Sequence, residues 1–160
     1  MTAAEYIRLT ESDPAYQARL REMEAEREQL RQRCIEDEQG LVVELRALGL
    51  RIDSVYDLVN NRPHPVLQNK FVGPYREAYP VLLKHLGIAH EPNIREGIIR
   101  ALIVRDLPRE AHAVLLQQLR NEPNRIHRSC LALALRKALG RKEAARVPEV
   151  QAALQEGMVD

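Results

Sequence analysis

The sequence contains no tryptophan and a single phenylalanine, and aromatic residues make up only 4% of its 160 residues. Glycine is also scarce, at seven residues. Strands favour aromatic and β-branched residues, whereas this chain is rich in Leu, Ala, Glu and Arg, which favour helices. The composition therefore predicts an all-α fold.

The sequence also has few cysteines, little net charge and no long apolar run. The two cysteines, Cys34 and Cys130, are too few for a disulfide framework, so we expect a cytoplasmic location. A formal net charge of +1 argues against a globally basic nucleic-acid-binding protein. No apolar stretch is long enough to span a bilayer, and residues 1–8 contain Glu5 and no apolar core, which is not typical of a signal peptide.

Catalytic motifs are absent from the sequence. It has no Gly-rich phosphate loop, no Gly-x-Ser-x-Gly and no His-Glu-x-x-His. His85 and His90 are five residues apart, which is a poor spacing for two metal ligands on one helical face. Cys34 and Cys130 fit packing positions better than nucleophilic ones. We therefore expect no enzymatic activity, cofactor or metal.

Residues 1–60 are predicted to form an N-terminal helical segment. Ser12 or Asp13 can cap a helix that starts at Pro14. A second, short helix is expected to follow Ser54, because Asp57 completes a capping box, and to end near Asn60. Residues 61–73 hold two prolines and are predicted to be a loop between this segment and the rest of the chain.

A heptad seam follows Pro14. Apolar residues recur in steps of four and three, interrupted by Arg27, at Tyr16, Leu20, Met23, Leu30 and Cys34. The seam resumes at Leu41, so one helix over about 14–48 is favoured over a hairpin at Gly40. The seam is expected either to pack onto the rest of the chain or to pair with a second chain, in which case a homodimer forms through this helix.

Residues 74–160 contain a repeat. Residues 79–86 and 112–119 are offset by 33 and share four of eight positions, all Val or Leu. Residues 147–154 resemble a third copy of this first helix. Second helices are expected at about 93–104 and 124–139, and a period of this length with two helices per unit is typical of an α-solenoid. The predicted core consists of Leu82, Leu83, Leu86, Ile98, Leu102, Leu115, Leu116, Leu119, Leu131 and Leu135.

The Pro-Val-Leu-Leu-x-x-Leu first helix and the Ile-Arg-x-x-Ile-Ile-x-Ala-Leu second helix resemble HEAT and HEAT-like repeats of the bacterial type. Arg95 stands at the place of the family's usual inner Arg. Arg128 shares its repeat position, and we expect each Arg to bridge neighbouring repeats or to cap a turn. The second unit departs from the pattern, because His127 replaces an apolar residue. The resemblance implies a short α-solenoid, a right-handed stack of helix pairs over residues 74–160. It implies little about function, because such proteins include scaffolds, immunity or inhibitor proteins, bilin lyases and DNA glycosylases.

Local charge gives the best indication of a binding surface. Between Arg120 and Arg146 there are eight basic and two acidic residues. In solenoids of this kind the second helices line the concave face, which predicts an apolar centre at Ile99 and Ile103 with a charged edge. The candidate partner-binding residues are Glu96, Ile99, Ile103, Arg125, Ser129 and Arg136.

The function that we expect is non-catalytic protein–protein interaction, as an immunity, inhibitor-type or scaffold protein. The alternative is a nucleic-acid-binding HEAT-like module. Nucleic acid is the less favoured partner, because the chain has few aromatic residues for base stacking and too few repeats to embrace a duplex.

Overall fold

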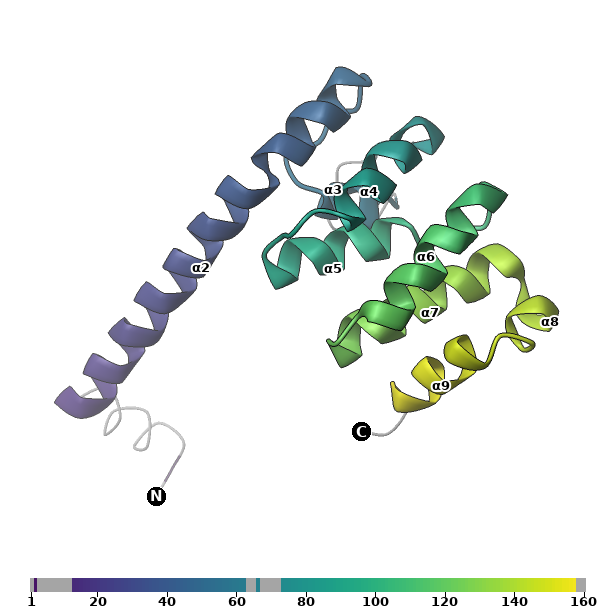
Figure 1. The fold of residues 1–160 in the computed structure, drawn as a ribbon. Helices are drawn as coiled ribbons and strands as arrows, with labels where there is room; N and C mark the ends of the chain where they lie inside the picture. The colour runs from purple at the N-terminus through teal and green to yellow at the C-terminus, as the bar shows by residue number, and fades with distance from the viewer. Residues whose placement is uncertain (1, 3–12, 63–65, 67–72, 158–160) are drawn as a thin grey trace. The chain divides into compact units, whose positions relative to one another are not determined.

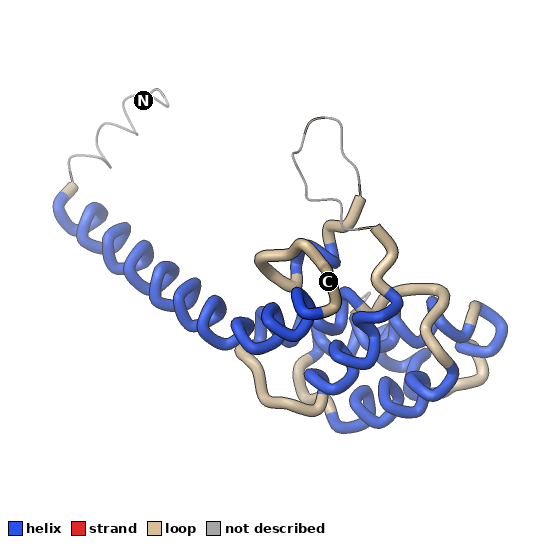
Figure 2. The backbone as a smooth tube through the Cα atoms, turned by 90° about the horizontal axis from the view of Figure 1, so that it is seen from above, coloured by secondary structure: helices blue, strands red, loops and turns tan. Residues whose placement is uncertain are grey.

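The computed structural model describes residues 13–62 and 73–157, together with Thr2 and Val66. All regular structure in these residues is helical, with eight α-helices, one 3-10 helix and no strand (Figure 2). The all-α prediction is therefore confirmed. Within the same residues, no helix is both long and apolar enough to cross a membrane.

The longest helix is α2, Pro14–Ala47. The carboxylate of Asp13 caps it by accepting a hydrogen bond from the backbone N–H of Ala15 at 2.9 Å, whereas Ser12 lies outside the described residues. Gly40 continues the helix without a break, so the single-helix prediction is confirmed and the hairpin is wrong. The chain forms two compact units, residues 1–36 and 37–160, which divide within α2. The predicted boundary at 61–73 falls largely outside the described residues and stays a prediction.

The second unit begins with the last turns of α2. Leu41 and Leu45 are fully buried there. The buried carboxylate of Glu38 accepts hydrogen bonds from the hydroxyl of Ser54 at 3.0 Å and the N–H of Val55 at 3.1 Å. Burial raises the pKa of Glu38, and these two hydrogen bonds offset the rise only in part.

The short helix α3, Tyr56–Val59, packs on α5, Pro92–Ala101. Half of the predicted capping box forms before it, since Asp57 accepts from the N–H of Ser54 at 3.3 Å, whereas the hydroxyl of Ser54 accepts from the N–H of Tyr56 and not from that of Asp57. A Cβ atom at Gly97 of α5 would lie 2.7 Å from Cγ1 of Val55, so only glycine lets the two helices approach this closely.

Two helix pairs follow, α4 with α5 and α6 with α7 (Figure 1). Helix α4 is Tyr79–Leu86, preceded by the 3-10 helix Arg76–Ala78, α6 is Arg109–Asn121 and α7 is Arg125–Leu139. Helix α5 also packs against α7 and α4 against α6. Asn124 caps α7, accepting from the N–H groups of Ile126 and His127.

Tyrosine hydroxyls hold the start of α4 to the end of α5. The rings of Tyr75 and Tyr79 meet edge to face, with centroids 5.8 Å apart. Tyr75 donates to the carbonyl of Ala101 at 2.8 Å, and Tyr79 donates to Oδ1 of Asp106 at 2.7 Å. Burial raises the pKa of Tyr75 to about 12, and burial together with the Asp106 hydrogen bond raises the pKa of Tyr79 as well.

The core of the helix pairs follows the repeat. Leu83 and Leu116, which share a repeat position, are partly exposed, so their predicted core placement is wrong. Because successive side chains on a helix point about 100° apart, two adjacent leucines cannot both face the core fully. The preceding residues, Leu82 and Leu115, are the ones that fill it. The other eight predicted core residues are buried: Leu82, Leu86, Ile98, Leu102, Leu115, Leu119, Leu131 and Leu135.

Two further helices complete the described chain, α8, Arg141–Ala144, and α9, Pro148–Glu156. Helix α9 corresponds to the third copy of the first helix and packs on α7. The sequence did not indicate α8. This helix begins directly after Gly140, whose φ is 82°. Such a positive φ favours glycine, so Gly140 allows the chain to reverse between α7 and α9.

Candidate functional site

The structure brings together two of the six candidate binding residues. Ile103 and Arg136 both line a cavity of about 590 Å³ at the ends of α5 and α7. Cavities of this volume fall within the usual range of ligand sites, about 300–1,000 Å³.

The other four candidates lie elsewhere. Ile99 is 0% exposed, so it belongs to the core and offers no surface to a partner. Glu96 pairs with Arg100 one turn along α5. Arg125 donates to the carbonyl of Glu156 at 2.8 Å, and Ser129 donates to the carbonyl of Ala153 at 3.3 Å. The last two side chains therefore fasten α9 to α7.

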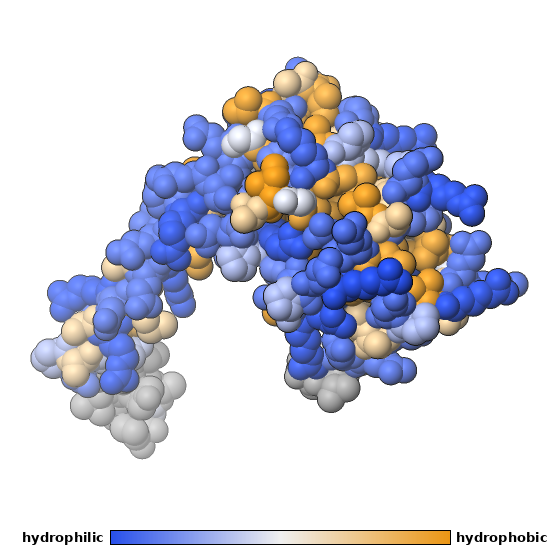
Figure 3. All heavy atoms as spheres, viewed as in Figure 1, coloured by the Kyte–Doolittle hydropathy of each residue, from blue (hydrophilic) through white to orange (hydrophobic). Residues whose placement is uncertain are grey.

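The cavity combines an apolar lining with basic side chains. Ile103 from the end of α5 and Leu133 and Leu139 from α7 supply the apolar part, and Leu133 is 41% exposed. Apolar surface is also visible between charged side chains over α4 to α7 in Figure 3. The lining contains no acidic residue and has four cationic ones, namely Arg105, Arg136, Lys137 and Arg141.

Basic side chains of the second unit are of two kinds. Arg95, Arg120 and Arg128 each pair with a carboxylate. The side chains of the four cavity cations have no ion pair or hydrogen bond within residues 13–62 and 73–157, and the same holds for some basic side chains outside the cavity, such as Arg109 and Arg146. The four differ from these in lying together around one cavity. Their charge is thus uncompensated beside the exposed Leu133 and the half-buried Ile103, which suits a ligand or partner surface that is both acidic and apolar.

Sequence reasoning missed most of this lining. The excess of basic residues after Arg120 was the signal for Arg136, Lys137 and Arg141. Leu133 was missed because it shares a repeat position with the exposed Arg100 rather than with an apolar residue. Arg105 follows the end of α5, so no helical periodicity could place it beside α7.

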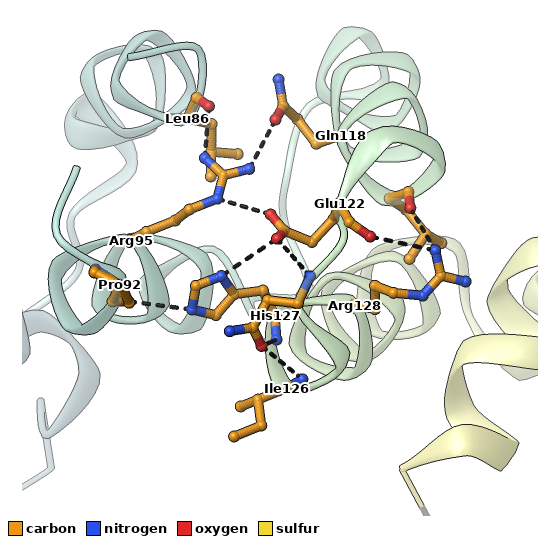
Figure 4. A network of polar contacts seen from close by, with 10 residues as sticks. Leu86, Pro92, Arg95, Gln118, Glu122, Ile126, His127 and Arg128 are labelled. Carbon is orange, nitrogen blue, oxygen red and sulfur yellow. Dashed lines mark hydrogen bonds and ion pairs between the residues drawn. The ribbon is translucent and has the colours of Figure 1, made fainter. Parts of the chain in front are cut away.

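Arg95 and Arg128 bridge helices, as predicted (Figure 4). Arg95 donates to the carbonyl of Leu86 at 2.9 Å, to Gln118 at 3.0 Å and to Glu122 at 2.8 Å. Arg128 repeats the first contact on Leu119, 33 residues later, at 3.3 Å. Both guanidinium groups therefore satisfy the C-terminal carbonyls of a first helix.

Glu122 lies at the centre of this network. Its carboxylate also accepts from the N–H of Asn124 at 3.0 Å and lies 3.5 Å from Nδ1 of His127. Burial opposes ionisation of Glu122, but the hydrogen bonds from Arg95 and Asn124 and the charge of Arg95 outweigh it. The pKa of Glu122 is therefore lowered.

His85 and His90 form a second polar network in the same unit. Nδ1 of His85 lies 3.0 Å from Nε2 of His90, and their outer nitrogens face Glu44 at 3.3 Å and Asp37 at 2.9 Å. The network links residues 37–44 of α2 to α4 and the following loop.

Within residues 13–62 and 73–157, no three His, Cys, Asp or Glu side chains are grouped so as to hold a metal ion. Cys130 is buried, and burial raises the pKa of its thiol, which disfavours the nucleophilic thiolate.

No family model, no curated protein and no solved structure matches this chain. The cavity and its charges are therefore the basis for the functional proposal.

Proposed function

We propose that this protein is a non-catalytic protein-binding module, of an inhibitor, immunity or scaffold type. The cavity lined by Ile103, Leu133 and the four cations is its partner-binding site. The observation that supports the proposal best is the group of uncompensated cations around exposed apolar side chains. Buried apolar anchors usually dominate the energy of an interface, and charges at the rim set its specificity and association rate.

We further propose that residues 74–157 are a short HEAT-like α-solenoid. Three observations support this: the 33-residue match in burial, the equivalent carbonyl contacts of Arg95 and Arg128, and the packing of α5 on α7 and α4 on α6. In a solenoid, each repeat contacts only its neighbours, and the end of the stack leaves a rigid surface for binding.

The partner that fits this site is a protein segment with an apolar side chain flanked by Asp or Glu. The apolar side chain would contact Leu133 and Ile103, and the acidic side chains would approach Arg136 and Arg141. The absence of acidic residues from the lining disfavours a basic partner.

Nucleic acid is the alternative partner, and the same four cations favour it. Tyr, Phe and Trp are absent from the lining, so the cavity offers no aromatic platform for bases. The salt response distinguishes the two partners. Duplex binding weakens steeply with salt and depends on several cations about equally, whereas a protein interface depends mainly on its apolar anchor.

A peptide-display selection tests the proposal. The full chain is presented to a library of peptides in which acidic residues flank one variable position. We expect enrichment of peptides with a large apolar residue at that position. Leu133→Asp should remove binding of the enriched peptide, and Arg136→Glu combined with Arg141→Glu should weaken it by about tenfold or more.

Matched controls lie on the same surface elements. Ile126→Asp changes an exposed apolar residue of α7, 58% exposed and outside the cavity, and should leave binding unchanged. Arg109→Glu reverses a single charge on α6, away from the lining, and is the control for Arg136→Glu alone. Equal loss of binding in Leu133→Asp and Ile126→Asp would contradict the proposed site. Salt-sensitive binding of a short DNA duplex, reduced equally by each cation variant, would support the alternative instead.

A further inference from the structure

The part of α2 in the first unit carries an apolar seam at its surface. Tyr16 and Met23 are 41% and 44% exposed, and Leu20, Leu30 and Cys34 are half-buried. These residues occupy the a and d positions of successive heptads, with Cys34 at an a position. A seam of this kind buries its apolar side chains when two helices supercoil around each other.

The charges beside the seam are complementary to themselves. In a parallel two-stranded coiled coil, each g residue faces the e residue five positions further along the second helix. Here Arg19 would face Glu24, and Glu26 would face Arg31, so both pairs join opposite charges. Charges at e and g set partner choice and helix orientation.

The antiparallel arrangement would reverse this pattern. Full overlap of the seam would then place Glu24 opposite Glu24 and Glu26 opposite Glu26, which brings like charges together. The parallel register has one like-charge contact of its own, because Arg27 at an a position faces Arg27 of the second copy. A single polar residue at an a position lowers stability but specifies the register.

We propose that residues 14–36 form a parallel, in-register coiled coil with a second copy of this chain. This inference is independent of the cavity at the ends of α5 and α7. The seam is short, at about three heptads, and includes Arg27, so the association is weak and depends on concentration. The parallel register places the two Cys34 residues in the same layer of the coiled coil. There the two Cα atoms come close enough for a disulfide, which requires a Cα–Cα distance of about 4.4–6.8 Å.

Oxidative cross-linking of the full chain tests the orientation. Under a mild oxidant we expect a reducible dimer whose yield rises with protein concentration. Cys34→Ser should abolish this dimer, and Cys130→Ser should not. An antiparallel pair would place Cys34 near Tyr16, so dimerisation without cross-linking would overturn the proposal.

Sedimentation velocity over a range of concentrations tests the role of the charges. Arg19→Glu creates two like-charge contacts per dimer and should weaken dimerisation by about tenfold. Adding Glu24→Arg should restore it. Arg21→Glu, the same change at the outer b position, is the matched control and should have little effect. A chain that stays monomeric at every concentration, or an equal response to Arg19→Glu and Arg21→Glu, would overturn the proposal.

Discussion

Nε of Arg95 lies 2.8 Å from a carboxylate oxygen of Glu122, and this ion pair joins α5 to the end of α6. The same guanidinium reaches Leu86 and Gln118, so one side chain holds three segments together. The side chain of Glu122 is only 5% exposed, so the interaction is shielded from solvent.

Arg95→Lys should lower the free energy of unfolding by about 1–3 kcal/mol, because lysine keeps the charge but cannot form all three contacts in this geometry. Urea denaturation measures the change. Arg120→Lys is the matched control, since Arg120 pairs with Glu149 at an exposed site and should lose less than about 1 kcal/mol. Similar losses for the two variants would contradict the bridging role of Arg95.

Glu122 should make the protein less stable in acid. Its pKa is lowered by folding, so its contribution to stability is present above the ordinary carboxyl pKa and is lost as the pH falls through the folded value. Glu122→Gln should therefore destabilise the protein near neutral pH and lose this penalty in acid. Unfolding curves measured from neutral to acidic pH would show the difference, and a pH-independent difference would contradict the assignment.

Glu38 should respond in the opposite sense. Folding raises its pKa, so its contribution favours the folded state at low pH and is lost as the pH rises through the folded value. The amide oxygen of Gln can still accept from Ser54 and Val55. The free energy of unfolding of Glu38→Gln, relative to that of the parent, should thus rise with pH. In the same series of unfolding curves, the corresponding difference for Glu122→Gln should fall with pH.

Two glycines inside helices should respond differently to alanine. Gly40→Ala should stabilise the protein by up to about 1 kcal/mol, because nothing lies within 4 Å of the new Cβ atom and alanine favours the helix. Gly97→Ala should destabilise it by about 1–3 kcal/mol, because the Cβ atom would clash with the stiff side chain of Val55. Thermal melting of both variants provides the comparison, and a stabilised Gly97→Ala would contradict the close packing of α3 on α5.

Adjacent leucines of α6 test the core. Leu115→Ala should cost about 2–5 kcal/mol, because Leu115 is fully buried. Leu116→Ala should cost less than half as much, because part of this side chain already contacts solvent. Chemical denaturation of the two variants would show the order, and equal costs would place both residues in the core.

Helical periodicity predicted the elements well but did not identify every contact. The seam continuing to Leu41 was enough to predict one helix through Gly40, because a single exposed glycine costs a helix little. The 33-residue match between 79–86 and 112–119 located α4 and α6. It could not separate Leu115 from Leu116, because both are apolar and only the packing of α6 on α7 decides which one faces the core.

The candidate site was harder to predict, because it depends on contacts between distant segments. Repeat position alone made Ile99 equivalent to Ala132 and suggested a surface, but both residues are fully buried. Ile103 and Arg136 were chosen because one is apolar and the other basic at the same repeat position, and the structure places both beside one cavity. The contacts of Asp37 and Glu44 with His85 and His90 could not be predicted from sequence spacing. The two carboxylates lie on α2, 53 and 41 residues before the histidines that they contact, and only the folded chain brings them together.

The two tyrosines at the start of α4 give the protein an intrinsic optical reporter. Without tryptophan, ultraviolet emission comes mainly from the five tyrosines, and a phenol that donates to a carboxylate, as Tyr79 does to Asp106, emits weakly. Release of this segment should therefore raise the emission of the chain without any attached dye. The raised pKa values of Tyr75 and Tyr79 should likewise delay their tyrosinate absorbance in alkali until the segment opens, so two of the five tyrosines should ionise in a separate, later step that a spectrophotometer can follow.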